Sequence, residues 1–305
     1  NQQQLMIEAP GMMTPEFPEP IFVLEDVKEL VSEPFRGVRI GRRFTHKFYH
    51  LEVDEITGRI TVIDRRTDRL LVDGMHLIGR EETMREGLDQ YDYTGRTFEA
   101  DLERVDLEES GEVRAVLLLT GQILSSSFEE RVFLYQDLDR IDVEVCLRWQ
   151  DEKPVRIQMV FPLANEDLKI HYGVPYGSRQ LDESRPQGEP DIGAYVKQRA
   201  CQGWIAVDDD DGGVVLSANR REFEFESKEI RSDLLRSSID PSSYSYRKMW
   251  RSYPDSCNAK YAIRGYLGDF RSELAHRDGW TLNQPMSSQS IYDTVSKRSL
   301  PDKLS

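Results

Sequence analysis

Apolar and polar positions alternate most strictly in residues 139–149. Every second residue is apolar and shares one side of the segment, namely Ile141, Val143, Val145, Leu147 and Trp149. The positions between them carry mostly charged side chains, namely Arg140, Asp142, Glu144 and Arg148. A period of two residues is typical of a β-strand with one buried and one solvated face. The segment therefore predicts a strand of an antiparallel sheet that packs on a core.

Shorter segments with the same alternation recur along the chain, separated by turns. Residues 47–54 and 59–64 flank Thr57-Gly58, where glycine supplies the positive φ of a tight hairpin. Further strands are expected at residues 70–72, 113–124, 128–135, 155–161, 168–174, 204–207, 214–216 and 223–225. Helical periodicity is weak, and residues 229–237 fit either short helical turns or the end of a strand. So many strands bury their apolar faces only when sheets stack, which predicts an all-β fold, a large antiparallel β-supersandwich with little helix.

The pattern also suggests how the chain is divided. Four prolines fall within the first 20 residues and interrupt regular structure, so residues 1–43 are expected to be a lead-in from an upstream region. Residues 44–285 are expected to form the β-supersandwich. Residues 286–305 are polar and rich in serine and lysine, and are expected to be a frayed tail.

Composition narrows the range of partners. The chain has 305 residues and a formal net charge of −15 at pH 7. Nucleic acids and anionic membranes bind clusters of lysine and arginine, so neither is an expected partner. A neutral ligand such as a sugar is neither attracted nor repelled by the negative net charge of the chain.

Location and redox state follow from two further features. No apolar run approaches the roughly 20 residues of a membrane span, and no segment has the order of a signal peptide. The three cysteines are too widely spaced for a disulfide framework or a zinc set, and Cys146 is expected to be a buried apolar side chain. We therefore expect a cytoplasmic protein.

Several short motifs occur in a fixed order. The first is FYHLEVDEITGRI at residues 48–60, followed by IDRRT at 63–67. The others are RIDVE with LRW within 140–149, VFPL at 160–163, YGVPYG at 172–177, LLRS at 234–237 and KYAI at 260–263. Together they resemble the C-terminal β-region of glycoside hydrolase family 38, the α-mannosidases. The resemblance implies a supersandwich of the galactose mutarotase-like kind.

The same resemblance has consequences for chemistry. Family members are retaining glycosidases whose nucleophile and zinc ligands come from an N-terminal barrel. This chain lacks that barrel's motif of closely spaced His and Asp. No catalytic residue, metal site or cofactor is therefore expected in the chain itself, and zinc is expected in the missing catalytic domain. The chain would pack on that barrel and contact carbohydrate, most simply an α-mannoside, and oligomers are possible.

The chain departs from the family pattern in two places. DSCN at residues 255–258 replaces a His-containing stretch, and YLGD at residues 266–269 also lacks the family's histidine. Contacts that the family makes through those histidines are not implied here.

Carbohydrate-contact candidates fall in three segments. The first is a polar, aromatic loop at residues 89–95 with Asp89, Tyr91, Asp92 and Tyr93, whose rings can stack on sugars and whose carboxylates can accept hydroxyl hydrogen bonds. Tyr172 and Tyr176, beside Pro175, could form a second sugar platform or simply a strand corner. Arg236 matches a family arginine that points to the barrel, and an ordinary ion pair is the structural alternative.

Other clusters favour structural explanations. The five histidines are scattered, and the two at residues 46 and 50 would not converge on one metal from a strand. The four aspartates at 208–211 are contiguous rather than alternating, which favours a charged hairpin turn over a calcium loop.

Three functions are compatible with the sequence. The chain could be the non-catalytic C-terminal region of an α-mannosidase-like hydrolase, or a stand-alone carbohydrate-binding module. A mutarotase-like epimerase would need a histidine acid and a carboxylate base, and His171 with a nearby glutamate is the one pairing available.

Overall fold

The computed structural model describes residues 23–31, 37–84, 91–151, 153–164, 168–181, 198–209, 211–220, 222–226, 228–237, 256–271 and 273–284. Within these ranges the chain forms nineteen β-strands and one α-helix. All the recorded strand pairs are antiparallel. The predicted all-β class is confirmed.

The strands form two sheets. The ten-stranded sheet runs in the order β1 (Val23–Val31), β2 (Gly37–Thr45), β3 (Tyr49–Asp54), β4 (Ile60–Asp64), β5 (Arg69–Met84), β11 (Val155–Pro162), β18 (Glu229–Arg236), β17 (Glu222–Glu226) and β14 (Gln198–Ala200), with β6 (Tyr91–Glu99) also paired to β5. The nine-stranded sheet runs in the order β13 (Gly177–Gln180), β12 (Lys169–Val174), β15 (Trp204–Asp209), β16 (Gly212–Ala218), β19 (Cys257–Leu267), β10 (Ile141–Arg148), β9 (Ser126–Tyr135), β8 (Arg114–Ile123) and β7 (Asp101–Ser110).

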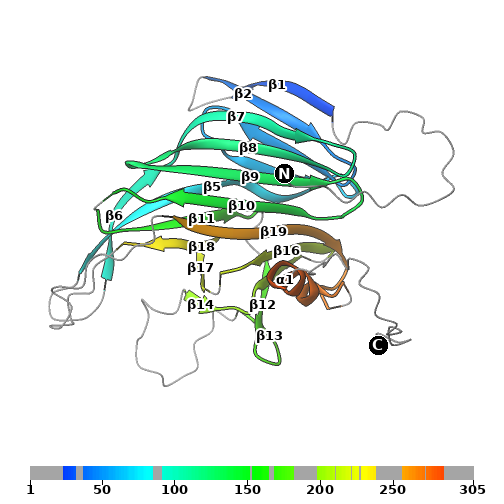
Figure 1. The fold of residues 1–305 in the computed structure, drawn as a ribbon. Helices are drawn as coiled ribbons and strands as arrows, with labels where there is room; N and C mark the ends of the chain where they lie inside the picture. The colour runs from blue at the N-terminus through cyan, green and yellow to red at the C-terminus, as the bar shows by residue number, and fades with distance from the viewer. Residues whose placement is uncertain are drawn as a thin grey trace, which may run out of the picture.

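The two sheets lie face to face and enclose one large apolar core (Figure 1). Strands of both sheets, such as β3 and β10, contribute every second residue to this core. Ring contacts cross between them, with the centroids of Phe161 on β11 and Tyr261 on β19 5.3 Å apart. The alternation in the sequence therefore reflects burial between two layers.

Most strand predictions hold in detail. The five apolar residues predicted to share one side of 139–149 are all buried. Of residues 229–237, all but Ser237 belong to strand β18 (Glu229–Arg236), and none forms a helical turn. The described aspartates of the acidic run lie at a hairpin, because Asp209 on β15 is paired with Gly212 on β16, and Asp210 lies outside the described residues.

Two placements differ from the expectation. Strands β1 and β2 join the ten-stranded sheet through pairing with β3, so the sheet begins within the segment expected to be a lead-in. Cys146 is half-buried rather than buried, because its odd neighbours on β10 take the inward positions and it points outward. The prediction for Cys146 was wrong, because the alternation along the strand places residue 146 among the outward positions.

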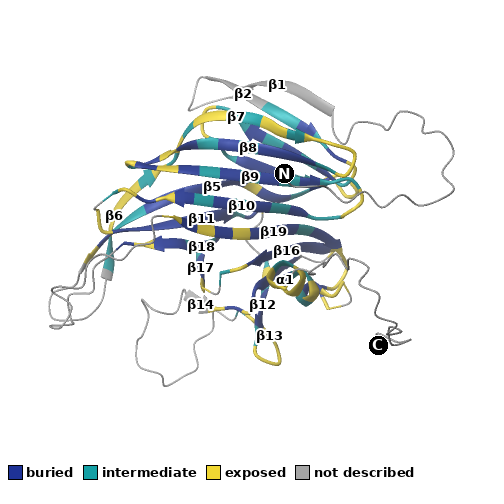
Figure 2. Ribbon diagram, in the orientation of Figure 1, coloured by how far each residue is buried: buried dark blue, intermediate teal, exposed yellow. Residues whose placement is uncertain are grey.

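One helix, α1 (Ala275–Asn283), lies outside the sandwich against β15, β16 and β19 (Figure 1). It covers a small second apolar cluster on the outer face of the nine-stranded sheet, composed of Trp204, Ala206, Val215, Tyr266, Phe270 and Ala275. Figure 2 shows the rest of the helix as largely exposed. In the described part of the chain, no helix has the length and apolar character needed to cross a membrane.

The hydroxyl of the buried Tyr49 forms hydrogen bonds between the two sheets, and its contribution to stability can be measured. The Tyr49 hydroxyl on β3 donates to Asp139 and accepts the backbone N–H of Gly265 on β19 at 3.1 Å. Tyr49→Phe is expected to lower the free energy of unfolding by about 1–3 kcal/mol, because it leaves buried polar groups without a partner. Urea unfolding measures the loss. Tyr176→Phe, at a fully exposed position, is the matched control, and equal stability losses in both variants would contradict the prediction.

Candidate functional site

A group of buried and half-buried polar side chains lies on the outer face of the ten-stranded sheet, away from the core. We call it the outer-face network, and it comprises Arg80, Tyr93, Arg156, Gln158, Glu224 and Asp233. Alternation explains why these residues gather. On β11, Ile157 and Met159 enter the core, so Arg156 and Gln158 between them point outward. On β17, Phe223 and Phe225 enter the core, which places Glu224 on the same outer face.

Glu224 is the centre of the network. Its Oε2 accepts hydrogen bonds from the Tyr93 hydroxyl at 3.2 Å and from Gln158 Nε2 at 3.1 Å. Its Oε1 accepts one from Arg80 Nη1 at 3.2 Å. The carboxylate is 4% exposed, so these donors replace the water that it loses on folding.

Arg156 links Glu224 to the second acid of the network. Its Nη1 donates to the Tyr93 hydroxyl at 2.7 Å, and its Nη2 lies 2.9 Å from Asp233 Oδ2. Burial would lower the pKa of Arg156, but the neighbouring Asp233, Tyr93 and Glu224 hold that pKa above its ordinary value. Burial raises the pKa of Asp233, although Arg156 opposes the shift. The two groups therefore depend on each other to remain charged.

Arg236 lies at the open margin of this network. It is the register partner of Arg156 across β11 and β18. Its Nε donates to Glu82 Oε2 at 2.8 Å, and its side chain is 42% exposed whereas that of Glu82 is 3% exposed. A buried carboxylate thus positions an accessible guanidinium, which can bind a carboxylate or hydroxyl group from outside the domain.

The first predicted contact segment is a strand rather than a loop, since residues 91–99 form β6 and pair with β5. Asp89 lies outside the described residues, and Tyr91 begins the strand. Asp92 is half-buried. Tyr93 belongs to the outer-face network, where the Arg80 guanidinium covers its ring at 3.4 Å from the centroid. The structure therefore brings Tyr93 and Arg236 to the same face of the sheet.

Tyr172 and Tyr176 do not form one platform. Tyr172 on β12 is 6% exposed and packs in the core, with its ring 6.2 Å from that of Phe225. Tyr176 lies in the turn before β13 and is fully exposed. These positions agree with the alternative of a strand corner, because four residues along a strand and its turn carry the two rings to different environments.

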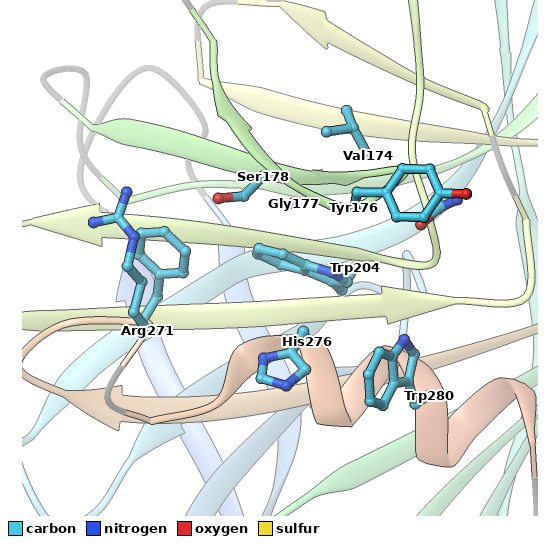
Figure 3. A pocket seen from close by; sticks show the side chains of 10 residues that line it. Val174, Tyr176, Gly177, Ser178, Trp204, Arg271, His276 and Trp280 are labelled. Carbon is cyan, nitrogen blue, oxygen red and sulfur yellow. The ribbon is translucent and has the colours of Figure 1, made fainter.

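Tyr176 instead borders a surface pocket of about 360 Å³ beside helix α1. We call it the α1 pocket, and its lining side chains include Val174, Tyr176, Ser178, Gln202, Trp204, Phe270, Arg271, His276 and Trp280. Figure 3 shows Arg271 at one end, Trp280 at the other, and Trp204 with His276 between them. Trp280 and Arg271 could not be recognised as site residues from the sequence, since only the fold brings three distant segments together.

Histidines and acids form no metal centre in the described ranges, where no three His, Cys, Asp or Glu side chains come together as ligands. His171, the histidine of the epimerase hypothesis, lies with its Nε2 3.3 Å from Asp208 Oδ2, and its ring stacks on Phe270 at 4.3 Å. Burial lowers its pKa. Its acidic neighbour is thus an aspartate rather than a glutamate, on the outer face of the nine-stranded sheet.

A comparison of the sequence with protein families identifies one family. The family described as "Glycosyl hydrolases family 38 C-terminal domain" matches residues 44–244. No curated protein matches the chain.

Two solved structures illustrate the shared fold. An alpha-mannosidase from Enterococcus faecalis V583 superposes with a TM-score of 0.60 at 11% identity, over 87% of this chain and 38% of that chain. A protein of glycosyl hydrolase family 38 from Enterococcus faecalis gives a TM-score of 0.57 at 12% identity, over 80% of this chain and 32% of that chain. The chain therefore spans less than half the length of either protein.

Proposed function

Since the chain belongs to glycosyl hydrolase family 38 through the family's C-terminal domain, we propose that it is the β-sandwich part of an α-mannosidase-like hydrolase. In this proposal it packs on a zinc-dependent catalytic barrel and helps to complete the barrel's sugar site. The protein would act on an α-mannoside. A cytoplasmic location is part of the proposal, supported by cysteines that are too widely spaced along the sequence for a disulfide framework.

The observation that carries the proposal is the position of Arg236. Its guanidinium is accessible and is held by a buried carboxylate, and Glu224 in the outer-face network beneath it already accepts hydrogen bonds from Tyr93 and Gln158. A face with rigid, buried charges and one accessible arginine is suited to a fixed contact with another domain. We propose that this face meets the barrel, with Arg236 directed to the rim of the sugar site.

The chemistry would belong to the barrel. Retaining glycosidases need a nucleophilic carboxylate and an acid–base carboxylate about 5–5.5 Å apart beside the sugar. The acids of the outer-face network are held by arginine, tyrosine and glutamine, and the described residues do not fit a zinc site. The role proposed for this chain is therefore to orient groups and exclude water.

Two assays test the proposal. The chain alone, supplied with zinc, is expected to show no turnover of an aryl α-mannoside. In the protein made from the complete native reading frame, Arg236→Ala is expected to lower kcat/KM by roughly tenfold or more, since an oriented charged contact is worth more than about 1.4 kcal/mol.

The matched control is Arg148→Ala, at an exposed arginine of the other sheet that pairs with Glu129. It should leave turnover unchanged. Turnover by the isolated chain, or equal activity in the Arg236 and Arg148 variants, would refute the proposal. So would a reading frame without a catalytic domain.

A further inference from the structure

We propose that the α1 pocket is a second, non-catalytic binding site for a neutral saccharide, with the rings of Tyr176 and Trp280 as its stacking surfaces. The site goes beyond the function proposed above. It lies on the outer face of the nine-stranded sheet, whereas the outer-face network belongs to the other sheet. Its helical wall also lies beyond residue 244, where the family match ends.

Tyr176 lies in a tight turn with a strained backbone. Pro175 and Tyr176 connect β12 to β13, and Val174 pairs with Gly177 across the turn. Tyr176 has φ +68°, a left-handed conformation that favours glycine and is costly for a bulky residue. Its ring is nevertheless fully exposed, so burial within the described structure does not compensate. A strained backbone that presents an exposed aromatic ring indicates a binding role.

Trp280 is the second exposed ring at the pocket. It lies on α1 with 60% of its surface exposed, and the adjacent His276 ring meets it edge-on at 5.0 Å. Beneath it, Gly279 lets the helix approach β15 closely, because a Cβ there would lie 2.9 Å from the Gly203 carbonyl oxygen. The helix thus presents the indole from a fixed position. Two large exposed rings that border one cavity are unusual for a solvated surface.

The floor and walls of the pocket are ordered as well. Trp204 is 5% exposed and packs against Gly173, where any side chain would collide with the indole. Phe270 lies between Trp204 and His171, with ring centroids 5.9 and 4.3 Å away. A rigid aromatic floor keeps the cavity open for a ligand without a prior rearrangement.

The polar lining identifies the ligand class. Ser178, Gln202, His276 and Arg271 offer hydroxyl, amide, imidazole and guanidinium groups, and among the described residues no carboxylate lines the pocket. The absence of an acid from the lining disfavours metal ions and basic ligands. The net charge of −15 disfavours anions, whereas a neutral polyol is unaffected. A pyranose presents an apolar C–H face to an aromatic ring and a rim of hydroxyls to such donors.

The size of the pocket suits a small saccharide. A volume of about 360 Å³ lies near the lower end of the range for ligand sites. With so few contacts, a Kd on the order of a millimolar is expected for a mono- or disaccharide.

Calorimetric and tryptophan-fluorescence titrations of the chain with methyl α-mannoside, α-linked mannobioses, maltose and cellobiose test the proposal. At least one is expected to bind with saturation. Trp280→Ala and Tyr176→Gly should each weaken that binding by about tenfold or more. Tyr176→Gly is the more telling variant, because glycine suits the turn and should not lower thermal stability.

Val113→Ala, at an exposed residue of the β7–β8 hairpin, is the control and should bind like the unaltered chain. No saturable binding of any saccharide at tens of millimolar would overturn the proposal, as would binding that survives both ring removals. Binding of a proline-rich peptide in place of every saccharide would also overturn it.

The outcome is independent of the proposed hydrolase role. In the complete protein, Trp280→Ala should leave aryl α-mannoside turnover unchanged, whereas Arg236→Ala should reduce it.

Discussion

Replacing Glu130 by glutamine is expected to stabilise the protein at alkaline pH and to flatten its pH dependence of stability. Glu130 occupies an inward position of β9, between Phe128 and Val132 in the core. Its Oε1 has no hydrogen-bond partner among the described residues. Burial raises the pKa of Glu130 from 4.5 to about 8. The folded state therefore holds a proton that the unfolded state releases.

The sign of the effect follows from this difference in bound protons. Between pH 4.5 and about 8 the unfolded chain binds fewer protons at this site, so stability falls as pH rises. Burial lowers the pKa values of His46 and His76, which makes their contribution fall as the pH drops below 6.5. His50 and His171 behave in the same way, and all four histidines still contribute just above pH 6.5, so the difference between the unaltered chain and Glu130→Gln from pH 6.5 to 8 isolates Glu130. Over that window the loss should be about 2 kcal/mol, since each pH unit corresponds to about 1.4 kcal/mol.

Urea unfolding at pH 6.5, 7.2 and 8 measures the change. Glu130→Gln removes the ionisation but keeps the shape, so the unfolding free energy of the variant should not show the loss that the unaltered chain shows over this range. Glu129→Gln is the matched control, because the neighbouring Glu129 points outward to Arg131 and Arg148. An unfolding free energy that falls equally in the Glu130 and Glu129 variants would contradict the assignment.

The same strand shows what the sequence can and cannot predict. Period-two alternation places β9 and β10 correctly, because strand geometry forces successive side chains to opposite faces. In β10 the charges all fall outward, so the phase is evident. In β9, Glu130 faces inward while Phe133 is only half-buried. Here the neighbouring strands and the opposing sheet decide which residues of β9 are buried. The sequence of the strand alone does not predict this.

The candidate site shows a similar division. Tyr93 and Arg236 could be selected from the sequence because their segments resemble family motifs or carry sugar-binding chemistry. Arg156, Gln158 and Glu224 read as solvated strand positions, and only the way β6 brings the Tyr93 hydroxyl to β11 and β17 reveals their burial. The α1 pocket depends on still longer-range packing.

Removal of Arg156 should produce the largest loss of stability among single side chains of the outer-face network. Arg156→Leu keeps most of the apolar stem but leaves Glu224 and Asp233 as buried acids without their shared cation. Breaking a buried pair in this way costs about 3–5 kcal/mol, because the remaining charge has lost both water and partner. Urea unfolding at pH 8 should show this loss. Arg148→Leu, at an exposed ion pair, should change stability by less than about 1 kcal/mol.

The pH dependence separates this cause from a simple packing defect. Burial already raises the pKa of Asp233, and the loss of Arg156 should raise it further. A lower pH should then protonate the Asp233 carboxyl and remove its uncompensated charge. The difference in unfolding free energy between Arg156→Leu and the unaltered chain should therefore become smaller from pH 8 to pH 5. Replacing Asp233 by leucine as well should recover part of the lost stability, since an apolar pair carries no uncompensated charge. A gap that is independent of pH, with no recovery in the double variant, would mean that the arginine acts through its volume alone.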